Sequence, residues 1–247
     1  LRAGMYQRYW GGNMDEGWTR WLLEHFAFPY TTLKDENIKQ GNLREQFDVI
    51  ILPSDPIPMI IGEKVEEWQR EQRPGFPPIT LPPEYRSGIG EEGTKCIKEF
   101  VEKGGTLVAF NESCNFCIEK LELRVKNILT FKPKEFYCPG STLKAKVDSC
   151  HPLGYGMPED ALILFWNSPA FEILPSENNE RYEIVVRYPE RDILQSGWLV
   201  GEEKITEKIA MLSIRHGEGR VVLIGFRTQH RAQTHGTFKL LFNALIG

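Results

Sequence analysis

The chain has 247 residues, of which 41% are hydrophobic and 26% charged, an ordinary composition that suits one large α/β domain. Its net charge of −4 argues against a nucleic-acid partner, because such partners bind a basic surface. No apolar run approaches the ~18 residues that suggest a membrane span, so no membrane partner is expected either. The sequence has no secretory signal peptide and begins at Leu1, which suggests a processed protein or a piece of a longer one, and it specifies no compartment.

Strands and helices alternate in the first fifty residues. A strand is expected within 2–9, and Asn13 with Glu16 three residues later makes a capping-box pattern that starts a helix. Four residues of that helix, spaced by one, three or four, are expected near one face: Trp18, Trp21, Leu22 and His25. A short strand over Tyr30–Leu33 precedes the apolar run 47–52, which is typical of a strand buried on both faces of a parallel sheet.

The stretch 53–90 is predicted to be a Pro-rich surface excursion with one helix over 60–69. Eight of the sixteen prolines fall between 53 and 83, and a proline cannot donate the backbone hydrogen bond that a central strand needs. Three glycines at the end of this stretch match the GxGxxG pattern: Gly88, Gly90 and Gly93. They do not follow a strand, so they indicate a turn into a helix and not a dinucleotide site.

The remaining elements complete an α/β pattern. A helix over 91–103 stops at Gly104, and a strand over Thr106–Phe110 and a helix over 113–123 follow. The part from 130 to 200 is irregular and β-rich, with four strand-like runs: LKAKV, ALILFW, YEIVVRY and SGWLV. The runs 209–214 and 220–226 flank HGEG as a hairpin, and four residues form the inward face of a last helix: Phe238, Leu241, Phe242 and Leu245. We therefore predict one domain over 1–247 with a doubly wound, mostly parallel sheet and antiparallel additions.

The turn after the strand Thr106–Phe110 is the most informative feature for function. A sharp strand-to-helix turn, or elbow, is where many α/β enzymes hold a nucleophile, but this elbow carries Asn111. Glu112 could act as an acid or base, and Ser113 or Cys114 as a displaced nucleophile. The simpler interpretation, which we prefer, is that Asn111 tolerates a left-handed backbone and that Ser113 caps the helix.

Two histidines follow the last predicted strand. His230 and His235 lie where open α/β sheets place their sites, and His230 could serve as a general base toward a nucleophile on the elbow. The alternative is that both side chains cap the last helix and bond loop backbone. Trp10, Trp18 and Trp21 are expected in the core and not in a ligand-binding box.

The five cysteines form no complete metal motif. Cys114 and Cys117 make one CxxC pair, but a zinc site usually needs a second pair, and a lone CxxC is weak evidence for redox chemistry. We expect small buried or half-buried thiols, with no cofactor or metal in this domain.

The order of these segments resembles the class I glutamine amidotransferase-like fold, a flavodoxin-like architecture. The similarity is carried by FDVIILP, by EFVEKGGTLVAF before the elbow, and by RVVLIGFRTQHR before the last helix. Three stretches are similar, more narrowly, to the amidotransferase-like domain that follows the peptidase domain of certain prokaryotic zinc carboxypeptidases: NMDEGWTRWLLEHFAFPYTTL, PPEYRSGIGEEG and GFRTQHRAQTHGTFKLLFNAL.

The resemblance implies lost glutaminase chemistry. The family has Cys at the elbow where this chain has Asn111, and its His-x-Glu pair falls on His230 and Ala232. PSDPIP stands where the family has a Gly-rich oxyanion loop. The carboxypeptidase resemblance implies a zinc-dependent hydrolase, but its His-x-x-Glu motif does not occur in this chain, so zinc is expected only in a peptidase domain upstream of Leu1.

These expectations lead to one main hypothesis and two alternatives. The main hypothesis is a non-catalytic accessory or interaction domain that packs on the peptidase domain of the same chain or binds a small ligand in a cleft near Asn111 and His230. The first alternative is a divergent hydrolase that uses Ser113 or Cys114 with His230. The second is an oligomerisation module, a role that related folds have in some glycosidases, and it would make the protein a homo-oligomer.

Overall fold

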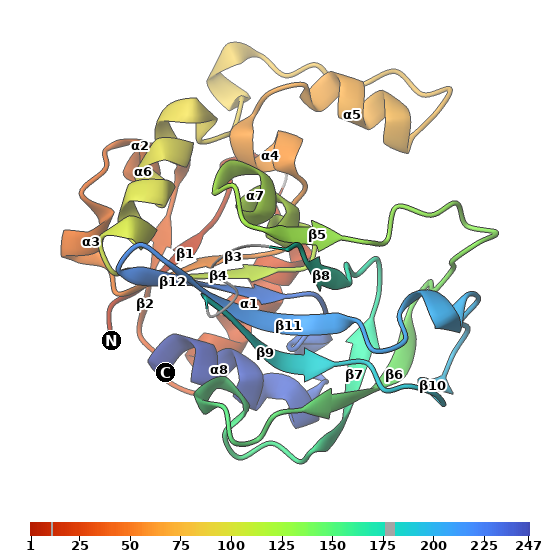
Figure 1. The fold of residues 1–247 in the computed structure, drawn as a ribbon. Coiled ribbons are helices and arrows are strands. Elements are labelled where there is room, and N and C mark those ends of the chain that lie inside the picture. The colour runs from red at the N-terminus through yellow and green to blue at the C-terminus, as the bar shows by residue number, and fades with distance from the viewer. Residues whose placement is uncertain (11, 176–180) are drawn as a thin grey trace.

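The computed structural model describes residues 1–10, 12–175 and 181–247. All strands of this part of the chain belong to one twelve-stranded sheet, whose main path runs β10-β6-β9-β11-β12-β4-β3-β1-β2. The strands are β1 (Ala3–Tyr6), β2 (Tyr30–Leu33), β3 (Val49–Leu52), β4 (Thr106–Phe110), β5 (Val125–Asn127), β6 (Ser141–Val147), β7 (Asp160–Phe165), β8 (Phe171–Ile173), β9 (Tyr182–Arg187), β10 (Leu194–Ser196), β11 (Ile209–His216) and β12 (Gly219–Ile224). Figure 1 shows the sheet running through the middle of the molecule.

The sheet has a parallel half and an antiparallel half. Strands β2, β1, β3, β4 and β12 are parallel neighbours, whereas β11, β9, β6, β7 and β10 pair antiparallel. Strand β5 pairs with β8, which pairs with the first residue of β11, Ile209, through Phe171. The predicted fold class is therefore confirmed, with the antiparallel additions formed by the β-rich part of the sequence.

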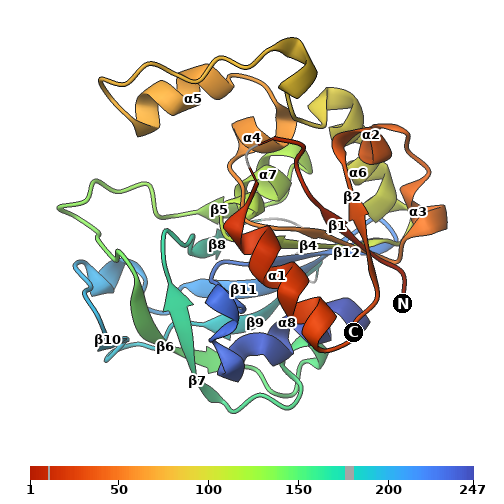
Figure 2. The same ribbon diagram turned by 180° about the vertical axis from the view of Figure 1, so that it is seen from behind.

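Helices cover both faces of the parallel half (Figures 1 and 2). One face carries α1 (Met14–His25) and α8 (Phe238–Ile246). The other carries α2 (Asp35–Lys39), α3 (Leu43–Gln46), α4 (Ile57–Ile61), α6 (Gly90–Glu102) and α7 (Ser113–Lys120), and α5 (Val65–Gln72) projects beyond them. Successive residues of a strand point to opposite faces, so Val49 and Ile51 pack in one core, and Ile50 and Leu52 in the other.

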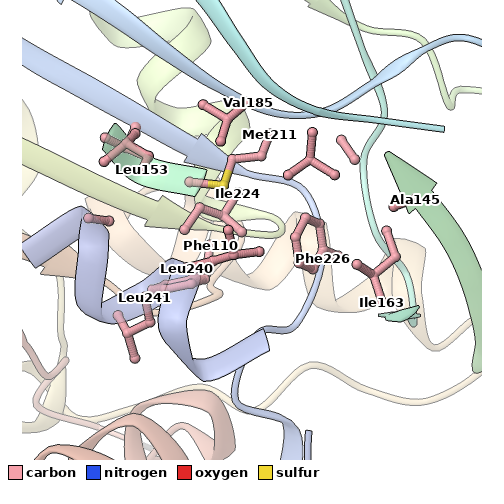
Figure 3. Close-up of a cluster of buried hydrophobic side chains, with 14 of the residues drawn as sticks. Phe110, Ala145, Leu153, Ile163, Val185, Met211, Ile224, Phe226, Leu240 and Leu241 are labelled. Carbon is pink, nitrogen blue, oxygen red and sulfur yellow. The ribbon is translucent and has the colours of Figure 1, made fainter. Parts of the chain in front are cut away.

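The core beneath α8 connects the two halves of the sheet. Figure 3 shows Phe110 from β4, Ile224 from β12 and Met211 from β11 lying together over Leu240 and Leu241 of α8. All five side chains are fully buried. Burial of a large aliphatic or aromatic side chain contributes about 1.5–3 kcal/mol, so this cluster fixes β4 and the turn that follows it.

The Pro-rich stretch differs from the prediction in its helices. The single helix expected over 60–69 is two helices, α4 and α5, separated at Gly62, which has a φ of 83°. A Cβ at Gly62 would lie 2.9 Å from the Cα of Gly88, because the end of α4 lies against the turn that precedes α6. Gly90 has a φ of 62° and opens α6, so the glycines of GIGEEG make a turn into a helix, as predicted.

Two further expectations were wrong in detail. Helix α1 buries Leu22 and Leu23, whereas Trp21 is 49% exposed and stacks on the exposed ring of His25. Trp21 therefore lies on the solvent side of the helix and not in the core. The run SGWLV is not a strand: β10 precedes it, and only Val200 forms an isolated bridge, to Tyr137.

Candidate functional site

The candidate site lies at the carboxyl ends of four neighbouring parallel strands. Strands β1, β3, β4 and β12 all end at the same edge of the sheet, where open α/β folds place their ligands. The segments that leave these strands carry four charged side chains, one for each strand: Arg8, Asp55, Glu112 and Arg227. The start of α1 adds Asp15 and the N-cap residue Asn13 to the same edge.

The side chain of Asn111 at the elbow is fully buried. Its φ is 46°, so the residue has the left-handed backbone that we predicted for it. Its Nδ2 donates to the carbonyl of Trp166 at 3.2 Å, and its Oδ1 accepts from the hydroxyl of Ser168 at 3.4 Å. The amide is thus a structural link between the elbow and the turn after β7.

Ser113 and Cys114 also face the interior. The Ser113 hydroxyl donates to the carbonyl of Pro53 and accepts from the backbone N–H of Asp55 at 2.9 Å, so it joins the elbow to the loop after β3 and does not cap α7. The thiol of Cys114 lies within 3.4 Å of the Ala109 carbonyl, and burial raises its pKa well above the usual range for a thiol. A buried thiol of this kind is a poor nucleophile.

Glu112 points the other way. It is exposed, and in the part of the chain that the structure describes its carboxylate accepts no hydrogen bond. The protein around the carboxyl group displaces water and raises its pKa; Asp15 adds to this rise, and Arg227 opposes it. Glu112 is therefore the one elbow residue whose polar group faces outward with its bonding capacity unused.

His230 lies between two tryptophan rings. It begins the short 3₁₀ helix η5 (His230–Ala232), and its ring contacts Trp18 at 4.8 Å and Trp166 at 5.3 Å between centroids, both edge-on. Its Nδ1 is buried without a hydrogen-bond partner among the described residues. Burial lowers the pKa of His230, and the nearby guanidinium of Arg227 lowers it further. Within the described ranges no carboxylate orients this ring, and no hydrogen bond joins it to Ser113 or Cys114.

Two buried ion pairs at this edge were not predicted from the sequence. Asp15 accepts from Nε and from the second terminal nitrogen of Arg227, at 2.9 and 3.3 Å. Asp55 accepts from Arg8 and from the Nδ2 of Asn13, both at 2.7 Å. Burial nevertheless raises the pKa of Asp55 to about 7. The only sequence signal was the place of each charge just beyond a strand or at a helix start.

Two hollows open beside this edge, and Glu112 lines both. The ion-pair hollow has a volume of about 580 Å³ and includes Arg8, Asp15, Asp55, Trp68, Glu112 and Arg227 in its lining. The amide hollow has a volume of about 590 Å³ and includes Glu112, Asn115, Asn127, Tyr137, Trp166 and Asn167. Asn111 and His230 line neither of these two hollows, so the open space beside the elbow is centred on Glu112.

The remaining predicted groups are dispersed. Cys114, Cys117 and Cys138 are buried, Cys96 is half-buried and Cys150 is exposed, all as free thiols. Among the described residues, no three His, Cys, Asp or Glu side chains lie together in a way that could hold a metal ion. His235 is exposed and packs on Phe238.

Among the helices of the described ranges, none is long and apolar enough to cross a membrane.

Comparison with known proteins identifies the fold. No protein-family model and no curated protein matches the sequence. A cytoplasmic protein from Salmonella typhimurium is 12% identical, with a TM-score of 0.55 over 99% of this chain and 97% of that one. A ThuA-like protein from Bacteroides uniformis is 14% identical, with a TM-score of 0.50 over 99% and 89%. A GMP synthase subunit from Thermoplasma acidophilum is 8% identical, with a TM-score of 0.54 over 99% and 92%. At these identities the likeness shows the fold alone, an amidotransferase-like α/β fold.

Proposed function

We propose that this chain is a non-catalytic amidotransferase-like domain that binds a small ligand beside Glu112. The observation that carries the proposal is the state of the elbow. The position that would hold the nucleophile is Asn111, a fully buried amide bonded to Trp166 and Ser168. An amide in that state cannot attack a substrate, and Ser113 and Cys114 are turned inward.

Binding is supported by what lies around the elbow. The two hollows have volumes in the range of small-molecule sites, and they meet at a carboxylate that has no partner among the described residues. Both Arg8 and Arg227 are held by buried aspartates, so the walls of the ion-pair hollow are already ordered before a ligand arrives. Pre-ordered walls lower the entropic cost of binding.

We propose, from the similarity of three sequence stretches, that the parent protein is a zinc carboxypeptidase-like hydrolase. In that context this domain would be an accessory module whose partner is the peptidase domain of the same chain. The zinc chemistry would belong to that peptidase domain. Sequencing the gene upstream of Leu1 tests this context; an open reading frame without a His-x-x-Glu metal motif would overturn it.

The non-catalytic part of the proposal is tested by glutamine hydrolysis. We expect ammonia release by the purified chain to equal the rate of the buffer alone. The control is His230→Ala, which removes the histidine that falls on the position of the family's catalytic histidine. Turnover by the unmodified chain that disappears in His230→Ala would contradict the proposal and favour the divergent hydrolase with Ser113 or Cys114. Light scattering on the same sample addresses the alternative of a homo-oligomerisation module.

A further inference from the structure

The side chains that line the amide hollow restrict the chemical class of its ligand more than the volume of the hollow does. It lies between the start of α7, the end of β5, the loop 133–139 and the turn after β7. The first three segments follow one another within residues 112–139, and the turn after β7 comes later in the chain. The loop and the turn belong to the irregular β-rich part of the sequence. A ligand of this hollow would be bound beside Glu112, so its chemical class deepens the proposed function and rests on it.

Several polar groups of this hollow have hydrogen-bonding capacity that the described protein does not use. Asn115 accepts from the Nδ2 of Asn127 at 3.1 Å, which leaves the Asn115 amide hydrogens free. Asn167 is exposed, and its side chain forms no hydrogen bond with the described residues. Its φ of 47° is a left-handed conformation that asparagine tolerates, and it sets the direction of the turn. With the Glu112 carboxylate, the hollow thus offers both donors and acceptors.

Aromatic rings provide the apolar part of the lining. Phe136, Tyr137 and Trp166 all line the hollow. Two contacts hold the Trp166 ring: the Arg227 guanidinium lies 5.0 Å from its centre, and the His230 ring packs edge-on against it. Tyr137 is 41% exposed and packs edge-on against Trp198, so its ring and hydroxyl are accessible from solvent. Rings of this kind combine an apolar face with a polar tip.

The charge of the lining disfavours anionic ligands, and its polarity disfavours purely apolar ones. Among the described residues no lysine, arginine or histidine lines the hollow, so a phosphate or a carboxylate would meet Glu112 without a cation to balance it. A purely apolar ligand would cover the amides of Asn115 and Asn167 and the Glu112 carboxylate without giving them hydrogen-bond partners, which disfavours its binding. The ion-pair hollow differs in this respect, because it contains two guanidinium groups.

We infer that the amide hollow binds a neutral polyhydroxylated ligand such as a saccharide. Vicinal hydroxyls both donate and accept, so they match amide side chains in either orientation, and a carboxylate accepts from two hydroxyls at once. The C–H face of such a ligand packs on the aromatic rings. No bond is made or broken in this step, and the ligand leaves as it arrived.

The test is a titration of the purified 247-residue chain with a panel of neutral mono- and disaccharides. The panel also contains glucuronate as an acidic sugar and a lysine ester as a cation. Saturation-transfer NMR detects which compounds bind, and calorimetry gives the Kd. We expect at least one neutral saccharide to bind with a micromolar to millimolar Kd, and glucuronate to bind at least tenfold more weakly than its neutral counterpart.

Variants locate the site. Glu112→Gln should raise the Kd of the saccharide about tenfold, because it removes charge-assisted hydrogen bonds. Asn167→Gly keeps the left-handed backbone but removes the amide, and it should raise the Kd about threefold to tenfold. Glu119→Gln is the matched control, since Glu119 is an exposed carboxylate on α7, the helix that Glu112 precedes, and it should leave the Kd unchanged. Circular dichroism of each variant verifies that it is folded.

The possible outcomes separate this inference from the proposed function. If no neutral saccharide binds, or if Glu112→Gln and Asn167→Gly both bind as tightly as the unmodified chain, the inference is overturned. If the lysine ester binds instead and Glu112→Gln abolishes its binding, the ligand class is wrong while a binding role beside Glu112 stands. Glutamine turnover would overturn the proposed function itself.

Discussion

The two sides of the elbow after β4 have opposite surroundings, although they lie within four consecutive residues. Asn111, Ser113 and Cys114 face inward, and their polar atoms are bonded to Trp166, Pro53, Asp55 and the carbonyl of Ala109. Glu112 faces outward between two hollows with its carboxylate unpaired in the described structure. The difference teaches that packing can turn most side chains of one sharp turn inward while a neighbouring side chain of the same turn stays accessible to ligands.

The largest expected effect is on the inward side. Asn111→Val should lower the free energy of unfolding by about 2–4 kcal/mol. A β-branched residue at a φ of 46° costs about 1–2 kcal/mol, and the lost amide leaves polar partners unpaired at a further ~1–3 kcal/mol. Urea denaturation measures the loss. Asn111→Gly is the matched control, because glycine accepts the backbone and loses only the amide, so it should destabilise by about half as much. Equal stability of the Val variant and the unmodified chain would contradict the inward role.

The second effect concerns the link between the elbow and the loop after β3. Ser113→Ala should lower the free energy of unfolding by about 1–3 kcal/mol, since the backbone N–H of Asp55 then has no partner at a buried site. Ser113→Cys keeps a weak hydrogen-bonding group and should lose less. Thermal denaturation of both variants shows which of them loses more stability. A neutral Ser113→Ala would show that water replaces the hydroxyl.

The third effect is on the pH dependence of stability. Asp55 has a pKa of about 7 in the folded chain and about 3.9 when unfolded, so between these values the folded state binds more protons. Its contribution to stability is therefore largest below pH 4 and decreases as the pH rises to 7. Asp55→Asn removes this titration, and stability should then fall less between pH 5 and pH 8, by on the order of 1–2 kcal/mol.

Asp15 and Glu112 also have raised pKa values, and His230 has a lowered one. The measurement is therefore the difference in the free energy of unfolding between Asp55→Asn and the unmodified chain at each pH. Identical pH profiles of the two proteins would show that Asp55 is ionised throughout this range.

The smallest effect is expected on the outward side. Glu112→Gln should change the free energy of unfolding by no more than about 0.5 kcal/mol, and in the stabilising direction at pH 7, because the ionised carboxyl is disfavoured by its surroundings. Chemical denaturation of this variant beside Asn111→Val compares neighbouring residues of one turn. A loss as large as that of Asn111→Val would mean that Glu112 is a structural residue.

The parallel half of the fold could be predicted from the sequence, and the site only in part. The run that forms β3 is continuously apolar, and β4 is bounded by glycines and a turn, so local pattern was enough to place both strands. The left-handed Asn111 also followed from residue type. Arg227 and Asp15 could not be paired in advance, because they are 212 residues apart and meet only through the order of the strands.

The amide hollow was also beyond prediction. Its lining comes from the elbow and from the irregular β-rich part, where the strand pairing depends on long-range contacts and not on local periodicity. The expected face of α1 failed for a related reason. The spacing of Trp21 and His25 is helical, but the sheet lies against Leu22 and Leu23, and only the packing decides which stripe of a helix is buried.

Intact-protein mass spectrometry after exposure to an electrophilic glutamine analogue tests most directly the proposal that the elbow has no available nucleophile. We expect label only on the exposed Cys150, so that Cys150→Ser removes it, and no label on Ser113 or on the buried Cys114. This result would agree with an elbow whose nucleophilic groups are all bonded inward. A stoichiometric adduct on Ser113 or Cys114 that is lost in His230→Ala would contradict the account and establish a working catalytic pair.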